Sequence, residues 1–204
     1  MTLSPNFDRC EKFATSLLLK QKVFSSTQIK VTDLQFDYDI VFDTFSHYCQ
    51  VTETPSYTFF LPGTMVFQDC LTIKRGSVYI ILYNGRDNNY ARRNWSIAHE
   101  IGHIYLGHKT DGPQEEIEAN FFAAQLLMPE AVLRTIYYNN KRLNANDVHR
   151  YFYVSKPAAI KRIHTLNHKY FNSSEENEVL LERFRDAIEY ICFNQSKILE
   201  VSFV

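Results

Sequence analysis

The sequence contains few residues that interrupt regular structure, with six glycines and six prolines among 204 residues. This scarcity argues against a loop-dominated all-β chain. No apolar run approaches the roughly 20 residues that cross a bilayer, since Lys20 interrupts the apolar stretch at residues 17–19. The first residues include the acidic Asp8 and Glu11 and show no signal-peptide pattern. We therefore expect a cytoplasmic protein with no membrane partner.

Cysteine is also sparse. The four cysteines are scattered along the chain and form no C-x-x-C pair; they are Cys10, Cys49, Cys70 and Cys192. We expect buried free thiols, as is usual in a reducing cytosol.

The net charge of −1 conceals one basic segment. Residues 134–169 carry eight basic side chains and one acidic side chain, Asp147. This segment is the only indication of an anionic partner. Hydrophobic residues make up 45% of the chain and aromatic residues 15%, which is enough for a folded core. The length predicts a single domain over 1–204.

The most informative segment is His99-Glu100-Ile101-Gly102-His103, which has the pattern H-E-x-x-H. On a helix the two histidines lie one turn apart on one face, so both imidazoles can bind one Zn²⁺. Glu100 lies about 100° around the helix, where it can act as a general base toward water. A donor to the oxyanion is also expected, and His149 and Tyr105 are among the candidates.

The flanking residues support a helix. Residues 91–98 contain neither proline nor glycine, and isoleucines at 97, 101 and 104 form an apolar stripe at helical spacing. Gly102 costs about 1 kcal/mol relative to alanine in a helix, which suggests that another backbone approaches closely there. Gly107 is expected to end the helix as a C-cap.

A zinc protease needs a third protein ligand. A metzincin pattern is excluded because Leu106 and Lys109 stand where its glycine and third histidine would be. His108 follows His103 by five residues and is a weak candidate. The next helix, expected from Pro113 to about residue 127, is a better source. There Glu118 has apolar neighbours that would make an unpaired charge costly, and Glu115 is the main rival.

The chain resembles the ImmA/IrrE family of zinc metallopeptidases. The resemblance lies in residues 94–103, followed by residues 118–129 with the sequence EANFFAAQLLMP. Weaker similarities are the strand ending at residues 83–84, the segment 152–155, and Arg162 after the alanines at 158 and 159. Residues 1–70 show no clear family motif.

The resemblance implies a compact zincin-like, gluzincin-like fold. His99 and His103 would be the zinc histidines, Glu118 the third ligand and Glu100 the general base. Family members typically cleave a helix-turn-helix transcriptional repressor in response to DNA damage or another stress. The implied partner is therefore such a repressor, whose cleavage would derepress stress, phage or mobile-element genes.

Two other functions are consistent with the residues. One is a DNA-binding regulator, because residues 145–170 are basic and superficially resemble a helix-turn-helix motif. The apolar side chains of this segment, such as Val154 and Ile163, suggest packing instead, so direct nucleic-acid binding is not expected. The other is a metal-binding regulator that acts on a repressor without proteolysis.

The predicted fold class is α+β, mostly helical with a small antiparallel sheet. Residues 1–55 are expected to be an N-terminal helical part, with a helix over 5–21. The segment 32–48 is expected to be a helix, although its β-branched and aromatic content makes a strand the alternative. Strands are expected between 57 and 83. The surest covers 78–83, and it could be either an edge strand that holds an extended peptide or a buried core strand.

The last third of the chain is expected to be helical. Helices are predicted at 129–138, 145–152, 157–170 and 173–196. Ser173 and Glu176 would form the capping box of the C-terminal helix.

Overall fold

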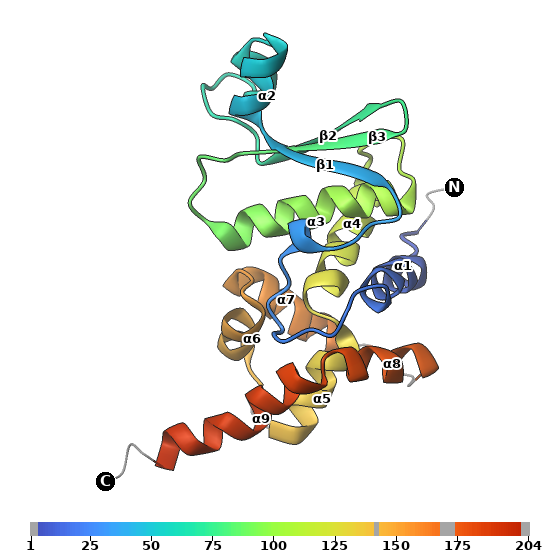
Figure 1. Cartoon of the computed structure of the whole chain (residues 1–204), viewed down its shortest axis with the longest axis vertical. Coiled ribbons are helices and arrows are strands. Elements are labelled where there is room, and N and C mark those ends of the chain that lie inside the picture. The colour runs from blue at the N-terminus through green and yellow to red at the C-terminus, as the bar shows by residue number, and fades with distance from the viewer. Residues whose placement is uncertain (1–3, 141–142, 168–173, 201–204) are drawn as a thin grey trace.

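The computed structural model describes residues 4–140, 143–167 and 174–200. In these residues a helical body carries a small three-stranded sheet, as expected for an α+β zincin-like domain (Figure 1). The α-helices are α1 (Phe7–Leu19), α2 (Phe45–Thr52), α3 (Tyr90–Leu106), α4 (Pro113–Leu127), α5 (Glu130–Asn140), α6 (Ala145–Phe152), α7 (Lys156–Asn167), α8 (Glu175–Arg183) and α9 (Arg185–Glu200). Two 3-10 helices, η1 (Val31–Asp33) and η2 (Ser56–Phe59), and three strands, β1 (Asp39–Thr44), β2 (Cys70–Arg75) and β3 (Val78–Tyr83), complete the set.

The strand order is β1-β3-β2. β2 and β3 form the expected antiparallel pair, and Gly76 turns between them with a φ of 61° that suits glycine. β1 pairs with β3 in parallel, so the sheet is mixed and not wholly antiparallel. β3 lies between the other two strands, so residues 78–83 form the buried core strand that was the alternative to an edge strand. Among the described residues, β2 is an edge strand.

Residues 32–48 do not form the predicted helix. They contain most of η1, all of β1 and the start of α2. Along β1, Ile40 and Phe42 pack against the main core, whereas Val41 is exposed. This alternation is the period of two that a half-buried strand requires, so the strand alternative is confirmed for residues 39–44.

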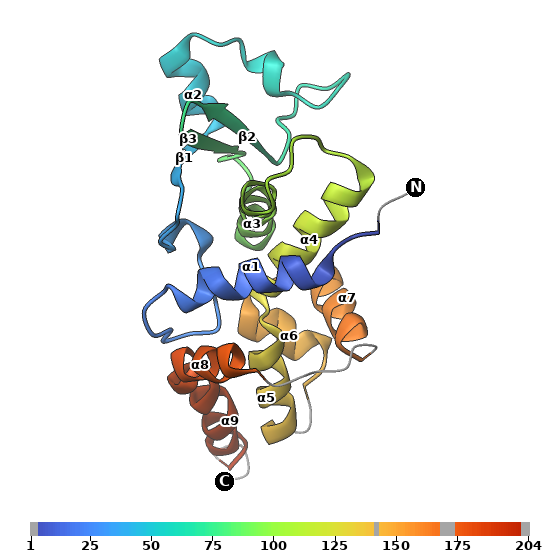
Figure 2. The same ribbon diagram turned by 90° about the vertical axis from the view of Figure 1, so that its right-hand side faces the viewer.

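The sheet lies between α2 on one side and α3 on the other (Figures 1 and 2), and an apolar cluster packs on each face. On one face Ile81 belongs to the main core, which also contains buried side chains of α3. On the other face Leu82 packs into a smaller cluster with Phe45 of α2 and with Phe59 and Phe67 from the connection to β2. Successive side chains of β3 thus point to opposite faces, as the pleat requires.

α3 runs below the sheet, and α1 and α4 pack against the side of α3 that faces away from the sheet (Figures 1 and 2). α1 begins at the N-cap Asn6, whose side chain accepts a hydrogen bond from the Arg9 amide. Its fully buried residues include Ala14, Leu17 and Leu18, which belong to the main core. The predicted helix over 5–21 is confirmed within two residues at each end.

The helices after α4 form the lower part of the molecule in Figure 1. The C-terminal helix is divided: α8 ends at Arg183, and α9 begins at Arg185 after the buried Phe184. The predicted cap Ser173 lies outside the described residues. Ser174 is the observed N-cap, and its side chain accepts a hydrogen bond from the Asn177 amide at 3.2 Å.

Some of the basic side chains of residues 134–169 make hydrogen bonds within the fold. Arg162 is 2% exposed, and its Nε donates to the carbonyl of Met128 at 3.0 Å. Arg134 donates to the carboxylate of Glu130 at 2.8 Å. The helix-turn-helix-like region contributes apolar side chains to the main core, among them Val148, Phe152, Val154 and Ala159.

All four cysteines are free thiols in the structure, as predicted, but only Cys10 and Cys49 are buried, whereas Cys70 and Cys192 are partly exposed. In the described ranges, none of the helices has both the length and the apolar composition needed to cross a membrane.

Candidate metal centre

Helix α3 presents the two motif histidines on one face. It begins at the N-cap Asn89, whose side chain accepts a hydrogen bond from the Arg92 amide at 3.0 Å. It ends at Gly107, which has the left-handed φ of 65° and donates to the Ile104 carbonyl at 3.1 Å. The predicted C-cap is therefore confirmed. Between these caps, His99 and His103 lie one turn apart with their Nε2 atoms 3.0 Å from each other.

Gly102 sets how closely α4 approaches this face. A Cβ atom at Gly102 would lie 3.2 Å from both the Cα and the carbonyl oxygen of Ala119 and 3.1 Å from the Phe122 ring. The backbones of α3 and α4 are therefore close at this crossing, which confirms the packing reason expected for Gly102. Glu116, one turn before Ala119 and Asn120, consequently faces the two histidines.

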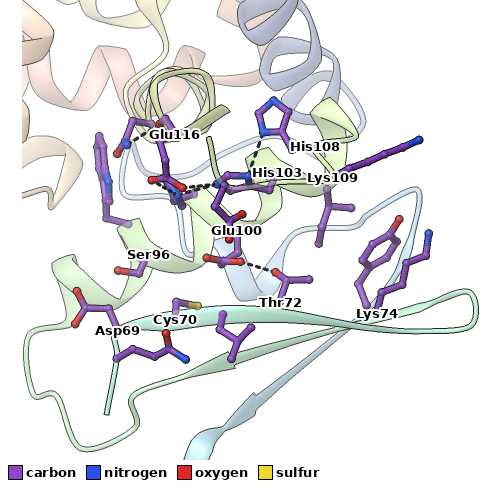
Figure 3. A pocket seen from close by; sticks show the side chains of 18 of the residues that line it. Asp69, Cys70, Thr72, Lys74, Ser96, Glu100, His103, His108, Lys109 and Glu116 are labelled. Carbon is purple, nitrogen blue, oxygen red and sulfur yellow. Dashed lines mark hydrogen bonds and ion pairs between the residues drawn. The ribbon is translucent and has the colours of Figure 1, made fainter. Parts of the chain in front are cut away.

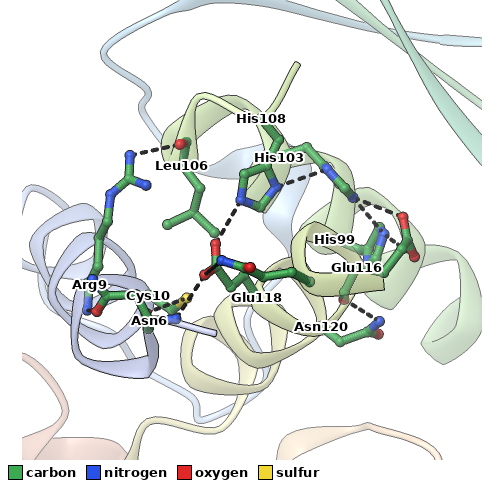
Figure 4. A network of polar contacts seen from close by, with 11 residues as sticks. Asn6, Arg9, Cys10, His99, His103, Leu106, His108, Glu116, Glu118 and Asn120 are labelled. Carbon is green, nitrogen blue, oxygen red and sulfur yellow. Dashed lines mark hydrogen bonds and ion pairs between the residues drawn. The ribbon is translucent and has the colours of Figure 1, made fainter. Parts of the chain in front are cut away.

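The carboxylate of Glu116 completes a group of three possible ligands (Figure 4). Glu116 Oε2 lies 3.5 Å from His99 Nε2, and Glu116 Oε1 lies 3.4 Å from His103 Nε2. Ligands about 2.0–2.1 Å from a tetrahedral Zn²⁺ would be about 3.3 Å apart. The three observed separations are close to this value, and the donor set of two imidazoles and one carboxylate is one that catalytic zinc sites use. The residues present therefore fit a zinc ion.

Both histidines are in an environment that favours the neutral ring. Burial lowers the pKa of His99, although the nearby Glu116 carboxylate opposes this effect. Burial also lowers the pKa of His103, and the neighbouring His99 and His108 lower it further. A neutral imidazole is the form that binds a metal.

Glu100 projects from α3 toward the sheet (Figure 3). Its Oε2 accepts a hydrogen bond from the Thr72 hydroxyl on β2 at 2.6 Å. Burial raises the pKa of the Glu100 carboxyl, although the hydrogen bond from Thr72 opposes the shift. Glu100, His99 and His103 line one open cavity of about 1000 Å³ between β2 and α3. The side chain predicted to be the general base thus shares a cavity with the possible metal ligands.

Glu118 is not part of the group of possible ligands. Its Oε2 lies 3.0 Å from His108 Nε2, and its Oε1 accepts from the Asn6 amide at 2.7 Å and from the Gln114 side chain at 3.2 Å. Burial would raise the pKa of Glu118, but these hydrogen bonds more than offset that effect and lower the pKa. Glu116 and Glu118 are about 200° apart around α4, so they cannot face the same ion.

Glu118 is buried, as its apolar neighbours in the sequence predicted, with 4% of the residue exposed. In this structure its carboxylate is paired by hydrogen bonds with Asn6, Gln114 and His108. The rival Glu115 lines a second, smaller cavity and is also outside the group. Glu116 could have been noticed because it shares a helix face with the small Ala119, the residue that allows the close crossing.

Two of the candidate oxyanion donors, Tyr105 and His149, lie elsewhere. The Tyr105 hydroxyl contacts Asp37, whose amide donates to it at 3.1 Å. The His149 ring nitrogen Nδ1 contacts the Val154 carbonyl between α6 and α7. Neither residue lines the cavity around Glu100.

Comparison with known proteins identifies the family. Residues 62–164, just over half of the chain, match the peptidase family described as the IrrE N-terminal-like domain. The matched range includes β2, α3 and α4, which carry the residues of the centre described above. A search of curated proteins returns no match to the chain. The range of the family match, together with the possible metal ligands within it, shows that this chain belongs to the IrrE N-terminal-like domain family of peptidases.

Proposed function

We propose that this protein is a zinc-dependent endopeptidase. The observation that carries the proposal is the group formed by His99, His103 and Glu116, with Glu100 beside it in the same cavity. We assign the first three as ligands and Glu100 as the general base. Zinc, when bound, would supply Lewis acidity toward a peptide carbonyl and toward water.

Glu100 is suited to move the proton. Its carboxylate would accept a proton from the attacking water and pass it to the leaving amine. Thr72 donates to Oε2 and so fixes the orientation of the carboxylate. Burial raises the pKa of Glu100, which makes the carboxylate a stronger base than an exposed one.

β2 is suited to hold the substrate. Its residues Cys70, Leu71, Thr72 and Lys74 line the cavity, and in the described residues it pairs with β3 alone. An extended peptide could add to its free edge by backbone hydrogen bonds, which would align a scissile bond beside Glu100. Binding of this kind requires an unfolded or extended segment of a protein substrate.

The proposed substrate is a helix-turn-helix transcriptional repressor, and the proposed consequence is derepression of stress, phage or mobile-element genes. Support for this finer assignment is the family resemblance of residues 94–103 and 118–129. A regulator that binds metal or DNA and acts on a repressor without cutting it is the competing function.

The first experiment measures zinc by elemental analysis in four proteins purified without chelator. We expect about one zinc per chain in the wild type and in Glu100→Gln, and none in Glu116→Gln, because only the last loses a ligand. Glu115→Gln is the matched control and should retain the metal. If Glu116→Gln retained full zinc, the ligand assignment would be refuted.

The second experiment tests proteolysis. Wild type and Glu100→Gln are each loaded with zinc and incubated with casein or with a helix-turn-helix repressor encoded beside this protein's gene. Cleavage by the wild type alone is the expected result. Cleavage by neither protein, with zinc bound to both, would favour the regulator that acts without proteolysis.

A further inference from the structure

The second ring nitrogen of His103 is held by a row of buried polar groups (Figure 4). His103 Nδ1 lies 3.1 Å from His108 Nδ1, and His108 Nε2 lies 3.0 Å from Glu118 Oε2. The side chains of His108 and Glu118 are 6% and 5% exposed. The row runs away from the proposed metal position, which lies on the Nε2 side of His103.

The order of donors in this row follows from the chemistry of the rings. If His103 Nε2 is to bind a metal, it carries no proton, and the ring proton is on Nδ1. His103 Nδ1 then donates to His108 Nδ1, so His108 carries its own proton on Nε2. That nitrogen donates to the Glu118 carboxylate, which only accepts. The geometry thus supports one arrangement of protons with the lone pair of His103 Nε2 free for the metal.

Local backbone structure brings His108 into the row. Gly107 adopts the left-handed conformation, which reverses the chain after α3. The His108 amide then donates to the His103 carbonyl at 3.0 Å, and the imidazole of His108 lies beside that of His103. Gly107, the C-cap of α3, therefore also positions the His108 imidazole between His103 and Glu118.

The far end of the row is fixed by the N-terminal helix. The Asn6 amide, at the N-cap of α1, donates to Glu118 Oε1 at 2.7 Å. Asn6 lies outside the residues that match the family, 62–164. The contact between Asn6 and Glu118 therefore connects the N-terminal segment to the proposed metal ligand His103 through the side chains of Glu118 and His108.

We propose that His108 and Glu118 are positioning residues for His103. They hold its ring in the tautomer and orientation that direct Nε2 toward His99 and Glu116, and so they raise the affinity of the site for zinc. Carboxylate–histidine partners of metal ligands have this effect generally. The inference depends on the proposed zinc site, because it names the residues that hold the proposed ligand His103 in place.

The test is zinc affinity measured by competition with a chromophoric chelator. His108→Phe keeps a ring and removes both nitrogens, and it should weaken zinc binding about 10- to 100-fold. Glu118→Gln keeps the size and removes the charge, and it should weaken binding by about tenfold. The matched controls are His47→Phe, an exposed histidine bonded to Asp43, and Glu115→Gln. Both controls should bind zinc as the wild type does.

A second readout uses the wild type alone and does not depend on variants that fold. In zinc-loaded protein labelled with ¹⁵N-histidine, NMR should show His103 protonated at Nδ1 and His108 protonated at Nε2. A His108 ring protonated at Nδ1 in the zinc-bound state would overturn the inference.

The outcomes separate this inference from the proposed function. Wild-type protein that binds no zinc would refute the proposed function. Wild-type binding with unchanged affinity in a folded His108→Phe protein would overturn the positioning role alone. Complete loss of zinc in Glu118→Gln, with full affinity in His108→Phe, would identify Glu118 as a direct ligand and would also overturn it.

Discussion

Replacing Gly102 with alanine tests whether the close crossing of α3 and α4 builds the proposed zinc site. In an isolated helix the substitution would stabilise by about 1 kcal/mol, because alanine has the higher helix propensity. In this protein the new Cβ would lie 3.2 Å from the Cα and the carbonyl oxygen of Ala119 and 3.1 Å from the Phe122 ring. Two of these three atoms belong to the backbone, so no side-chain rotation can relieve the contact.

The expected net effect is destabilisation. Forcing an extra methyl group into a packed interface costs about 1–3 kcal/mol, which exceeds the gain in propensity over most of that range. We therefore expect Gly102→Ala to lower the free energy of unfolding by up to about 2 kcal/mol. Relief of the contact requires α4 to move outward, and Glu116 would move with it. Zinc affinity should fall as well.

Urea unfolding of the metal-free protein measures the first effect and chelator competition the second. Gly76→Ala is the control, because Gly76 has a φ of 61° and no atom within 4 Å of an added Cβ. Strain at that turn should cost about 1–2 kcal/mol and leave zinc affinity unchanged. A Gly102→Ala protein that is more stable than the wild type and binds zinc equally well would refute the close-crossing argument.

Three further predictions concern the centre and its support. Thr72→Val should retain zinc and reduce kcat on a casein-derived peptide by about tenfold, because the Glu100 carboxylate loses its hydrogen bond; an unchanged kcat would exclude a role for Thr72. Asn94→Ala should lower the free energy of unfolding in urea by about 2–3 kcal/mol, because the buried amide bonds the backbone of both Ile29 and Val31; a loss below about 0.5 kcal/mol would contradict this account. Removing zinc with a chelator should lower the melting temperature, and zinc restored to 100 times its Kd should add about 2.7 kcal/mol of stability in thermal or urea unfolding. A melting temperature that does not respond to zinc would argue against a site in the folded state.

Several features of the centre could be predicted from the sequence because they depend on residues close together in the chain. The four-residue spacing of His99 and His103 places both rings on one face of any α-helix. Gly107 was expected to end α3 because a left-handed C-cap favours glycine, and Pro113 was expected to start α4 because the first helical position lacks a hydrogen-bond partner. Each of these statements needs only local geometry, and the structure agrees with each.

The contacts between distant segments could not be predicted in this way. Residues 39–44 have the side chains of a strand, but their parallel pairing with β3 joins segments about 40 residues apart, and this pairing moves β3 to the middle of the sheet. The hydrogen bond from Asn6 to Glu118 spans 112 positions. No periodicity in either segment indicates the other.

The sequence alone thus determined that this protein has a histidine pair on a helix, a glutamate beside it and acidic residues on the helix that follows. Only the tertiary structure decided which acid faces the pair. Residues 115, 116 and 118 are all glutamates, and they point in directions separated by the 100° step of the α-helix. Their roles depend on the rotation of α4 about its own axis, which is fixed by the contact of Gly102 with Ala119. Packing between two helices sets that rotation, and the pattern along one helix does not contain it.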